Sequence, residues 1–347
     1  MYSKHLTSNS STISDALRKL NSLGKNEPLT LFVVDDEKLV LGSLTDGDIR
    51  RSLTTNGTLS TKVGSIAYRD FIYLTYGDYN LNVIHSARNK GIELLPVLDA
   101  QHRIVDLVNL KKQKSFLPID AVLMAGGKGE RLRPLTENTP KPLIEVGGKA
   151  IIDYNIEMLI SYGLKNINVT VNYLAEQLEE HFSSPINGVK VETVREPNFL
   201  GTIGSVQFVK EFHNDTVLVM NSDLFTNIDY EDFYLHFREH GADMSVAAVP
   251  YDVSIPFGIF ELEGRDIKGI KEKPSYHYYA NAGIYLIKKD VLKYIPKNKF
   301  FNATDLIEEL VKLQMKVIRF PITGYWIDIG QHSELVKANE LLKHLKQ

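Results

Sequence analysis

A glycine-rich segment followed by fixed positive charge is the part of this sequence whose residue types could do chemistry. Residues 121–142 read AVLMAGGKGERLRPLTENTPKP, so an apolar run breaks into Gly126, Gly127 and Gly129. Glycine lets backbone N–H groups approach phosphate oxygens, and successive N–H groups form an anion-binding nest. Arg131 and Lys141 place positive charge beside it. The segment therefore predicts a buried strand that runs into a phosphate-binding turn.

The elements that must position this turn alternate between strand and helix over residues 118–347. We expect helices at 151–162, at 174–182 and from 203 onward, and strands at 167–171, 189–194, 217–220 and 244–250. This rhythm predicts an α/β domain with a Rossmann-like, doubly wound, mostly parallel sheet. Ligands of such sheets bind at the carboxyl ends of the strands, and the candidate site residues directly follow strands.

Residues 1–115 form a different domain, in which one unit recurs about 64 residues later. The unit consists of a helix, a strand and a return strand, expected first at 12–21, 31–35 and 39–44, and again at 79–90, 95–99 and 104–110. The repeat resembles a tandem pair of CBS motifs, a Bateman module, which binds adenine nucleotides in many proteins. A short basic linker, residues 111–117, precedes the second domain.

The two copies of the repeat are unequal. Gly42, Thr45 and Asp48 match the CBS pattern G-x-hydrophobic-T-x-x-D, in which the resemblance implies that Thr and Asp hold a ribose. The second copy departs from this pattern at Asp106, Asn109 and Lys112. We therefore expect any adenine nucleotide at Thr45 and Asp48. The alternative is a pair that binds no nucleotide and serves dimerisation or docking.

The pattern A-G-G-x-G-x-R-L-x-P-L-T, with P-K-P following, resembles the sugar-nucleotide pyrophosphorylases, nucleotidyltransferases that act on sugar 1-phosphates. The resemblance implies that sugar 1-phosphate and NTP give NDP-sugar and pyrophosphate. The attacking phosphate is already ionised near neutral pH, so no general base is required. The protein must instead position two anions and neutralise the developing charge, with Mg²⁺ as the implied cofactor.

The resemblance also assigns the site residues. Its catalytic positions match Arg131, Lys141, Asp223 and Lys273, and its metal carboxylates match Asp223 and Asp328. Its nucleotide-binding positions match Leu123, Ala125, Gly126, Gly127, Gly129, Glu196, Gly201, Thr202 and Asn221. Its sugar-binding positions match Gly258, Glu272 and Asn281. The chain departs from the family at Ser222, where Gly is usual, and this change bears on how closely the backbone approaches the nucleotide. It departs again at Ile203, where Ala is usual, and there a tighter base pocket is expected.

The base and the sugar follow only by analogy. The Pro140–Leu143 segment and the Gly147–Lys149 turn look more like mannose-1-phosphate guanylyltransferases than like thymidylyltransferases. A CBS pair ahead of such a domain is similar to the glucosamine-1-phosphate guanylyltransferases that serve legionaminic acid synthesis. We expect GTP, with glucosamine 1-phosphate ahead of mannose 1-phosphate. The alternatives are a guanylyltransferase for mannose 1-phosphate, a nucleotidyltransferase using another base, and a non-catalytic regulatory paralogue that senses sugar nucleotides.

The composition limits the remaining possibilities. A net charge of −3 offers no basic surplus for a nucleic acid or an anionic membrane. The absence of cysteine excludes disulfides and Cys-ligated metal sites. The first residues lack the apolar core of a signal peptide, and no apolar run approaches 18 residues, so we expect a cytoplasmic protein. A homo-oligomer is the expected assembly.

Overall fold

The computed structural model describes residues 2–25 and 27–345. The chain divides into two units, Met1–Phe116 with Ser161–Gly163, and Leu117–Ile160 with Leu164–Gln347. Each unit has hydrophobic clusters of its own, and each is described by itself.

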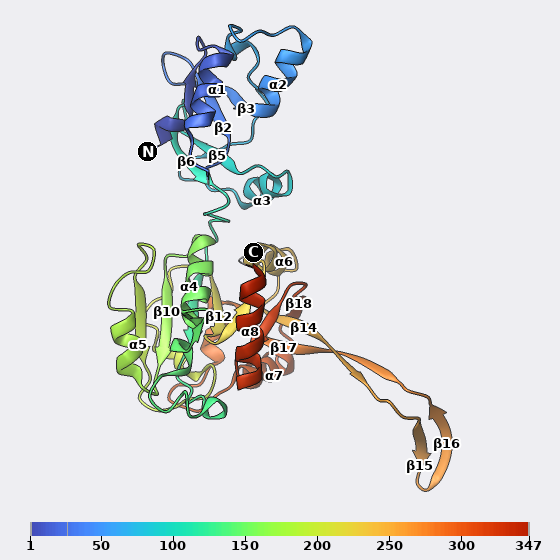
Figure 1. Ribbon diagram of the computed structural model, residues 1–347. Coiled ribbons are helices and arrows are strands. Elements are labelled where there is room, and N and C mark those ends of the chain that lie inside the picture. The colour runs from blue at the N-terminus through green and yellow to red at the C-terminus, as the bar shows by residue number, and fades with distance from the viewer. Residues whose placement is uncertain (1, 26, 346–347) are drawn as a thin grey trace. The chain divides into compact units, whose positions relative to one another are not determined.

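The first unit repeats one three-stranded arrangement (Figure 1). β2 (Thr30–Val34) pairs in parallel with β1 (Leu6–Ser8) and antiparallel with β3 (Val40–Thr45). β5 (Leu94–Leu98) pairs in the same way with β4 (Leu74–Thr75) and β6 (Ile104–Asn109). The helices of this unit are α1 (Ile13–Ser22), α2 (Asp46–Thr55) and α3 (Leu81–Asn89), with 3₁₀ turns at Tyr2–His5 and Val63–Ser65. The repeat predicted from the sequence is therefore present as two copies of one topology.

The second unit is organised around a seven-stranded sheet of order β11-β10-β7-β12-β17-β14-β18. Its strands are β7 (Asp120–Met124), β10 (Ile167–Val171), β11 (Val191–Arg195), β12 (Thr216–Asn221), β14 (Met244–Ser254), β17 (Ser275–Lys288) and β18 (Val317–Pro321). Only β17 runs antiparallel to its neighbours. The mostly parallel, α/β architecture expected from the sequence is confirmed. The interior strand β7 reads as an apolar run over Ala121–Met124 because both of its faces are covered.

Short elements complete this unit. Two small ladders pair β8 (Glu145–Val146) with β9 (Lys149–Ala150) and β13 (Leu224–Thr226) with β19 (Trp326–Asp328). The helices are α4 (Ile151–Ser161), α5 (Ala175–His181), α6 (Tyr230–Glu239), α7 (Ala303–Lys312) and α8 (His332–Leu345). The 3₁₀ turns are η3 (Glu130–Leu132), η4 (Lys141–Leu143), η5 (Gly204–Phe208) and η6 (Lys289–Tyr294).

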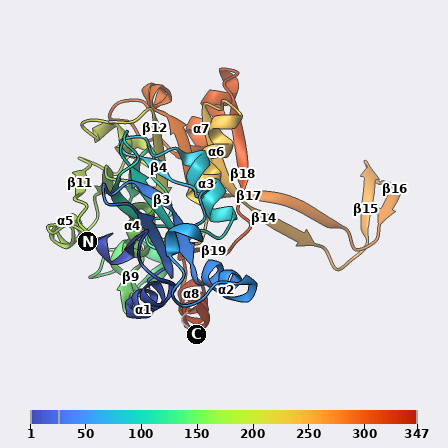
Figure 2. The same cartoon turned by 90° about the horizontal axis from the view of Figure 1, so that it is seen from above.

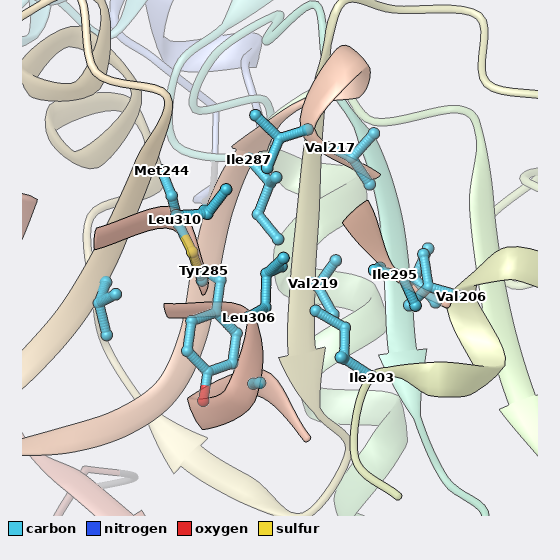
Figure 3. Packing of buried hydrophobic residues seen from close by; sticks show 14 of the residues in the cluster. Ile203, Val206, Val217, Val219, Met244, Tyr285, Ile287, Ile295, Leu306 and Leu310 are labelled. Carbon is cyan, nitrogen blue, oxygen red and sulfur yellow. The ribbon is translucent and has the colours of Figure 1, made fainter. Parts of the chain in front are cut away.

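A large apolar cluster packs on one face of the sheet. Leu306 and Leu310 of α7 belong to this cluster together with Val217 and Val219 of β12 and Ile203 of the loop before it (Figure 3). The sequence predicted a helix from residue 203, but the chain forms only the short η5. The backbone N–H groups of Ile203 and Gly204 both donate to Phe301 O, so this loop is tied to a distant segment.

A long two-stranded arm extends from the sheet (Figures 1 and 2). The outer parts of β14 and β17 stay paired as far as Ser254 opposite Ser275. Beyond them, β15 (Ile259–Glu263) and β16 (Asp266–Lys271) form a hairpin at the tip. Throughout residues 249–281, all of which the structure describes, no residue is buried.

Candidate active site

A cleft of about 640 Å³ lies where the strands β7, β10 and β12 end. These three strands are parallel neighbours, so their carboxyl ends meet at one edge of the sheet. The residues around the cleft come from the ends of these strands and the loops after them, from the segment after β11, and from the segment after β19. They are Met124–Arg131, Lys141, Pro142, Thr170, Asn172, Glu196, Phe199, Gly201, Thr202, Ser205, Asn221–Asp223 and Gly330.

The glycine-rich turn has the conformation that its sequence indicates. Gly129 adopts φ 62°, which is the left-handed region that glycine enters without strain. A Cβ at this position would lie 2.9 Å from Thr136 Cγ2 and 3.0 Å from Lys141 Cβ. The Thr136 hydroxyl donates to Gly129 O at 2.8 Å. The close packing of these three residues fixes where the Lys141 side chain leaves the backbone.

Lys141 lies between two carboxylates that are far apart in the sequence. Its ammonium forms an ion pair with Asp223 and lies 3.8 Å from Asp328 Oδ1. The ladder of β13 with β19 places Leu224 opposite Asp328, and Ile329 N donates to Asp223 O at 3.1 Å. Pairing of β13 with β19 therefore holds the two aspartates next to each other, on either side of Lys141.

The electrostatics of Asp328 combine opposing effects. Burial raises the pKa of its carboxyl group, and the nearby charge of Asp223 raises it further, whereas Lys141 and Arg131 lower it. Arg131 packs so closely on Gly330 that a Cβ there would lie 3.1 Å from its Nη2. Glycine at 330 therefore lets a guanidinium approach the acidic pair.

The acidic pair fits a hard divalent cation. Among the described residues, Asp328 Oδ1 is a buried oxygen without a hydrogen-bond partner. Within residues 2–25 and 27–345, no three His, Asp or Glu side chains gather into a self-sufficient metal site. Mg²⁺ commonly takes one or two carboxylates and completes its shell with phosphate oxygens and water. Asp223 and Asp328 would hold Mg²⁺ in that way.

A buried carboxylate, Glu196, lies beside the glycine-rich turn in the lining of the cleft. Its side chain is only 4% exposed and contacts the backbone at Gly126, and its Oε2 accepts from Leu200 N at 3.0 Å. Burial raises the pKa of this carboxyl group. Because one hydrogen bond satisfies it only in part, Glu196 has lone pairs left to accept from a ligand.

The loop after Glu196 is fastened to the start of α7. Gly201 adopts φ 81°, and a Cβ there would lie 2.6 Å from Phe301 O. Thr202 N donates to Asn302 Oδ1 at 3.3 Å, and the Thr202 hydroxyl accepts from Ala303 N at 2.9 Å. Backbone groups of this loop are thereby held at the rim of the cleft.

Ser222 has a structural use that the sequence did not indicate. Its hydroxyl donates to Met124 O at 2.8 Å, and its side chain is 3% exposed. The serine therefore ties the end of β12 to the end of β7 instead of filling the cleft, and the Asp223 carboxylate remains in place.

Most of the residues predicted to bind the nucleotide or the metal lie together at the cleft. Several other predicted site residues lie elsewhere. As far as the described residues go, the cleft lining includes none of Leu123, Gly258, Glu272, Lys273 and Asn281. Leu123 is fully buried within β7. Asn281, at the base of the arm, donates to Tyr285 Oη at 2.9 Å. Asp328 is absent from the lining but neighbours Gly330, which belongs to it.

The remaining predicted sugar residues lie on the arm. A Cβ at Gly258 would lie 2.9 Å from Glu272 Oε2, so these two residues adjoin each other. Lys273 follows with φ 44°. All three are exposed.

Sequence reasoning missed several residues around the cleft. Thr170 and Ser205 share a buried hydrogen bond of 3.0 Å, and Asn172 Nδ2 donates to Glu196 O at 3.4 Å. Phe199 is 51% exposed and contacts Phe300, with ring centroids 5.9 Å apart. The position of Thr170 and Asn172 at the end of a predicted parallel strand was the available signal.

In the first unit, Thr45 and Asp48 form the capping box of α2. The Thr45 backbone N–H and hydroxyl donate to Asp48 Oδ2 at 2.8 and 2.7 Å, and Arg51 pairs with Asp48 Oδ1. Thr12 and Asp15 form the same box at the start of α1. Thr45 and Asp48 therefore have a structural role before any ligand is considered.

The fold places a cleft lined by a glycine-rich turn at the carboxyl edge of an α/β sheet, and comparison with known proteins gives the family. The sequence model of the nucleotidyl transferase family matches residues 120–344, so the chain belongs to that family. The CBS domain model matches residues 6–55. Both resemblances indicated by the sequence motifs are confirmed.

Two curated relatives show the range of the family. The bifunctional protein GlmU of Methanocaldococcus jannaschii is 33% identical over 65% of this chain and 54% of its own length. The mannose-1-phosphate guanylyltransferase catalytic subunit beta of Drosophila pseudoobscura pseudoobscura is 29% identical over 62% of this chain and 60% of its own. The chain thus spans little more than half the length of these relatives.

A solved structure shows the same fold. HddC from Yersinia pseudotuberculosis is 26% identical, with a TM-score of 0.51 over 64% of this chain and 99% of that one. It has also been solved in complex with GMP-PN. Within the described part of this chain, no helix is long and apolar enough to cross a membrane.

Proposed function

We propose that this protein transfers a nucleotidyl group from an NTP to a sugar 1-phosphate, releasing pyrophosphate. The observation that carries the proposal is the position of Lys141 between Asp223 and Asp328, beside the glycine-rich turn. A phosphate oxygen of the sugar attacks the α-phosphorus in line. The bond from the α-phosphorus to the bridging oxygen of the β-phosphate breaks, and pyrophosphate departs with that electron pair.

The residues of the chain have separate tasks in this reaction. Backbone N–H groups of Gly126–Gly129 bind the phosphates, and Arg131 and Lys141 neutralise charge on the α-phosphate and the leaving group. Asp223 and Asp328 would hold Mg²⁺, which would supply further charge neutralisation when bound. The attacking phosphate oxygen is already ionised, so no residue of the protein has to accept a proton in this step.

GTP is the nucleotide that we propose. Glu196 is a buried acceptor beside the glycine-rich turn, and guanine carries an amino and an imino N–H on one edge, which suits a carboxylate. The GMP-PN complex of HddC and the guanylyltransferase relatives support this choice. As the sugar substrate we propose glucosamine 1-phosphate ahead of mannose 1-phosphate. We further propose that the product serves surface-glycan synthesis, such as the legionaminic acid pathway, and that the protein acts in the cytoplasm.

We propose a regulatory role for the first unit, with an adenine nucleotide at Thr45 and Asp48. The match to the CBS domain supports it. The competing proposal, a regulatory paralogue without activity, is disfavoured because Arg131, Lys141, Asp223 and Asp328 are all present.

Pyrophosphate release with Mg²⁺ tests the proposal across five NTPs and a set of sugar 1-phosphates. We expect release with GTP and a hexosamine or hexose phosphate, and loss of release in Asp223→Asn. Tenfold better turnover of UTP or dTTP would contradict the proposal that GTP is the nucleotide. No release with any pair, with nucleotide binding retained, would favour the regulatory paralogue.

A further inference from the structure

The arm separates residues that a sugar 1-phosphate site needs together. The nucleotide and metal residues line or adjoin the cleft, whereas Gly258, Glu272 and Lys273 are exposed on the arm. At about 3.3 Å per residue, the ladder carries Glu272 roughly 30 Å beyond Asn281 and the tip near Gly264 roughly 50 Å beyond the sheet. The site of one chain is therefore incomplete.

The ladder is built to stay extended. Pairing between β14 and β17 continues without a break from Ala248 opposite Asn281 to Ser254 opposite Ser275. At its base, the Arg319 guanidinium lies 3.8 Å from the centre of the Tyr279 ring, and farther out His277 Nδ1 lies 2.7 Å from Asp252 Oδ1. These contacts join the two strands of the ladder to each other and, through Arg319, to β18 at its base.

The arm exposes more apolar surface than a free hairpin tolerates. Its exposed large apolar side chains are 37–72% accessible and comprise Tyr251, Val253, Phe257, Phe260, Leu262, Ile267, Ile270, Tyr278 and Tyr279. Because an aromatic side chain carries about 150–250 Å² and these residues are roughly half exposed, the total is of the order of 800 Å². One partner in a standard protein interface buries about that area. An isolated two-stranded hairpin is at best marginally stable in water.

We infer that the arm of each chain packs on a second copy of this chain and completes that copy's sugar site with Glu272 and Lys273. The inference rests on the proposed function. Exchange of an identical element between two copies is a low-cost route to a dimer, and twofold symmetry makes the exchange reciprocal. The arm carries five acidic and four basic residues over 251–280, so its net charge of only −1 offers little repulsion to packing on a like chain.

Subunit mixing tests this exchange. One variant, Asp223→Asn, has a defective cleft and an intact arm, and the other, Glu272→Gln with Lys273→Ala, has an intact cleft and a defective arm. Heterodimers are purified by two different tags, and pyrophosphate release is measured. If arms are exchanged, one of the two sites joins an intact cleft to an intact arm, so about half of the wild-type specific activity returns. If each arm serves its own chain, both sites remain defective, and an inactive heterodimer overturns the inference.

A second readout does not depend on activity. Exposed Arg265 at the arm tip is a trypsin site, and Lys190 serves as an internal reference in the same sample. We expect cleavage after Arg265, relative to Lys190, to slow as the protein concentration rises, and Phe260→Glu with Ile270→Glu to abolish this slowing. The matched control is Leu313→Glu with Val336→Glu, which changes equally exposed residues outside the arm. Cleavage that is independent of concentration overturns the exchange, whereas an inactive wild type with concentration-dependent protection overturns only the proposed function.

Discussion

At the scale of single residues, Lys141 concentrates the chemistry because it is the cation placed between the two aspartates. We expect Lys141→Ala to lower kcat about 100-fold or more, since one lost electrostatic contact to a transition state is commonly worth that much. Lys190→Ala, which removes an exposed lysine paired with Glu192, is the control. Steady-state pyrophosphate release measures both, and an equal effect of the two substitutions would contradict the assignment.

Two adjacent glycines give a matched pair. A Cβ at Gly126 would collide with the Glu196 carboxylate, whereas a Cβ at Gly127 meets no described atom within 4 Å. We expect Gly126→Ala to lower the melting temperature of the ligand-free second unit by several degrees, since about 1 kcal/mol shifts Tm by ~2–4 °C in a unit of this size. Gly127→Ala should leave it unchanged. Calorimetry without nucleotide compares the two variants. Equal melting temperatures would show that the Glu196 side chain moves aside without destabilising the unit.

At the scale of elements, helix capping separates structure from ligand binding. The boxes Thr12–Asp15 and Thr45–Asp48 are alike, so Asp15→Ala and Asp48→Ala should each destabilise the first unit, because each removes the N3 carboxylate that accepts from the N-cap backbone N–H. If the proposed nucleotide site exists, only Asp48→Ala should also lose adenine nucleotide binding. Denaturant unfolding and calorimetric titration measure the two effects, and equal nucleotide binding by both variants would remove Asp48 from the site.

His181 at the end of α5 joins that helix to α4 through Asp153. His181 Nε2 lies 2.7 Å from Asp153 Oδ1, and this hydrogen bond raises the pKa of His181 above its ordinary value of 6.5. The pair stabilises the folded state fully below the unfolded pKa, and this contribution is lost as pH rises through the higher folded pKa. NMR titration should give a pKa above 6.5 that falls in Asp153→Asn. An unchanged pKa in that variant would assign the shift elsewhere.

At the scale of the whole molecule, two units with separate cores should respond separately to ligands. A ligand stabilises only the unit whose folded state binds it. We expect GTP with Mg²⁺ to raise the melting temperature of the second unit and to leave that of the first unchanged. Scanning calorimetry with and without nucleotide measures this, with Asp223→Asn as the control. If nucleotide raised the melting temperatures of both units together, the two units would unfold as one.

The sequence by itself determined the family, the mostly parallel sheet and the glycine-rich turn. These depend on local patterns: an apolar run for β7, glycine at the left-handed position 129, and basic residues at fixed spacing. The tandem repeat was also readable, because Asp35 and Asp99 each follow a short apolar strand.

Only the tertiary structure decided which distant residues meet. Asp223 and Asp328 share Lys141 because β13 pairs with β19, and no local pattern encodes that pairing. The Ser222 hydroxyl serves the β7–β12 junction because those strands are neighbours in the sheet. The same limit applies to the arm: the sequence motifs singled out Gly258 and Glu272, but only the tertiary structure placed these residues on an extended arm, outside the lining of the cleft.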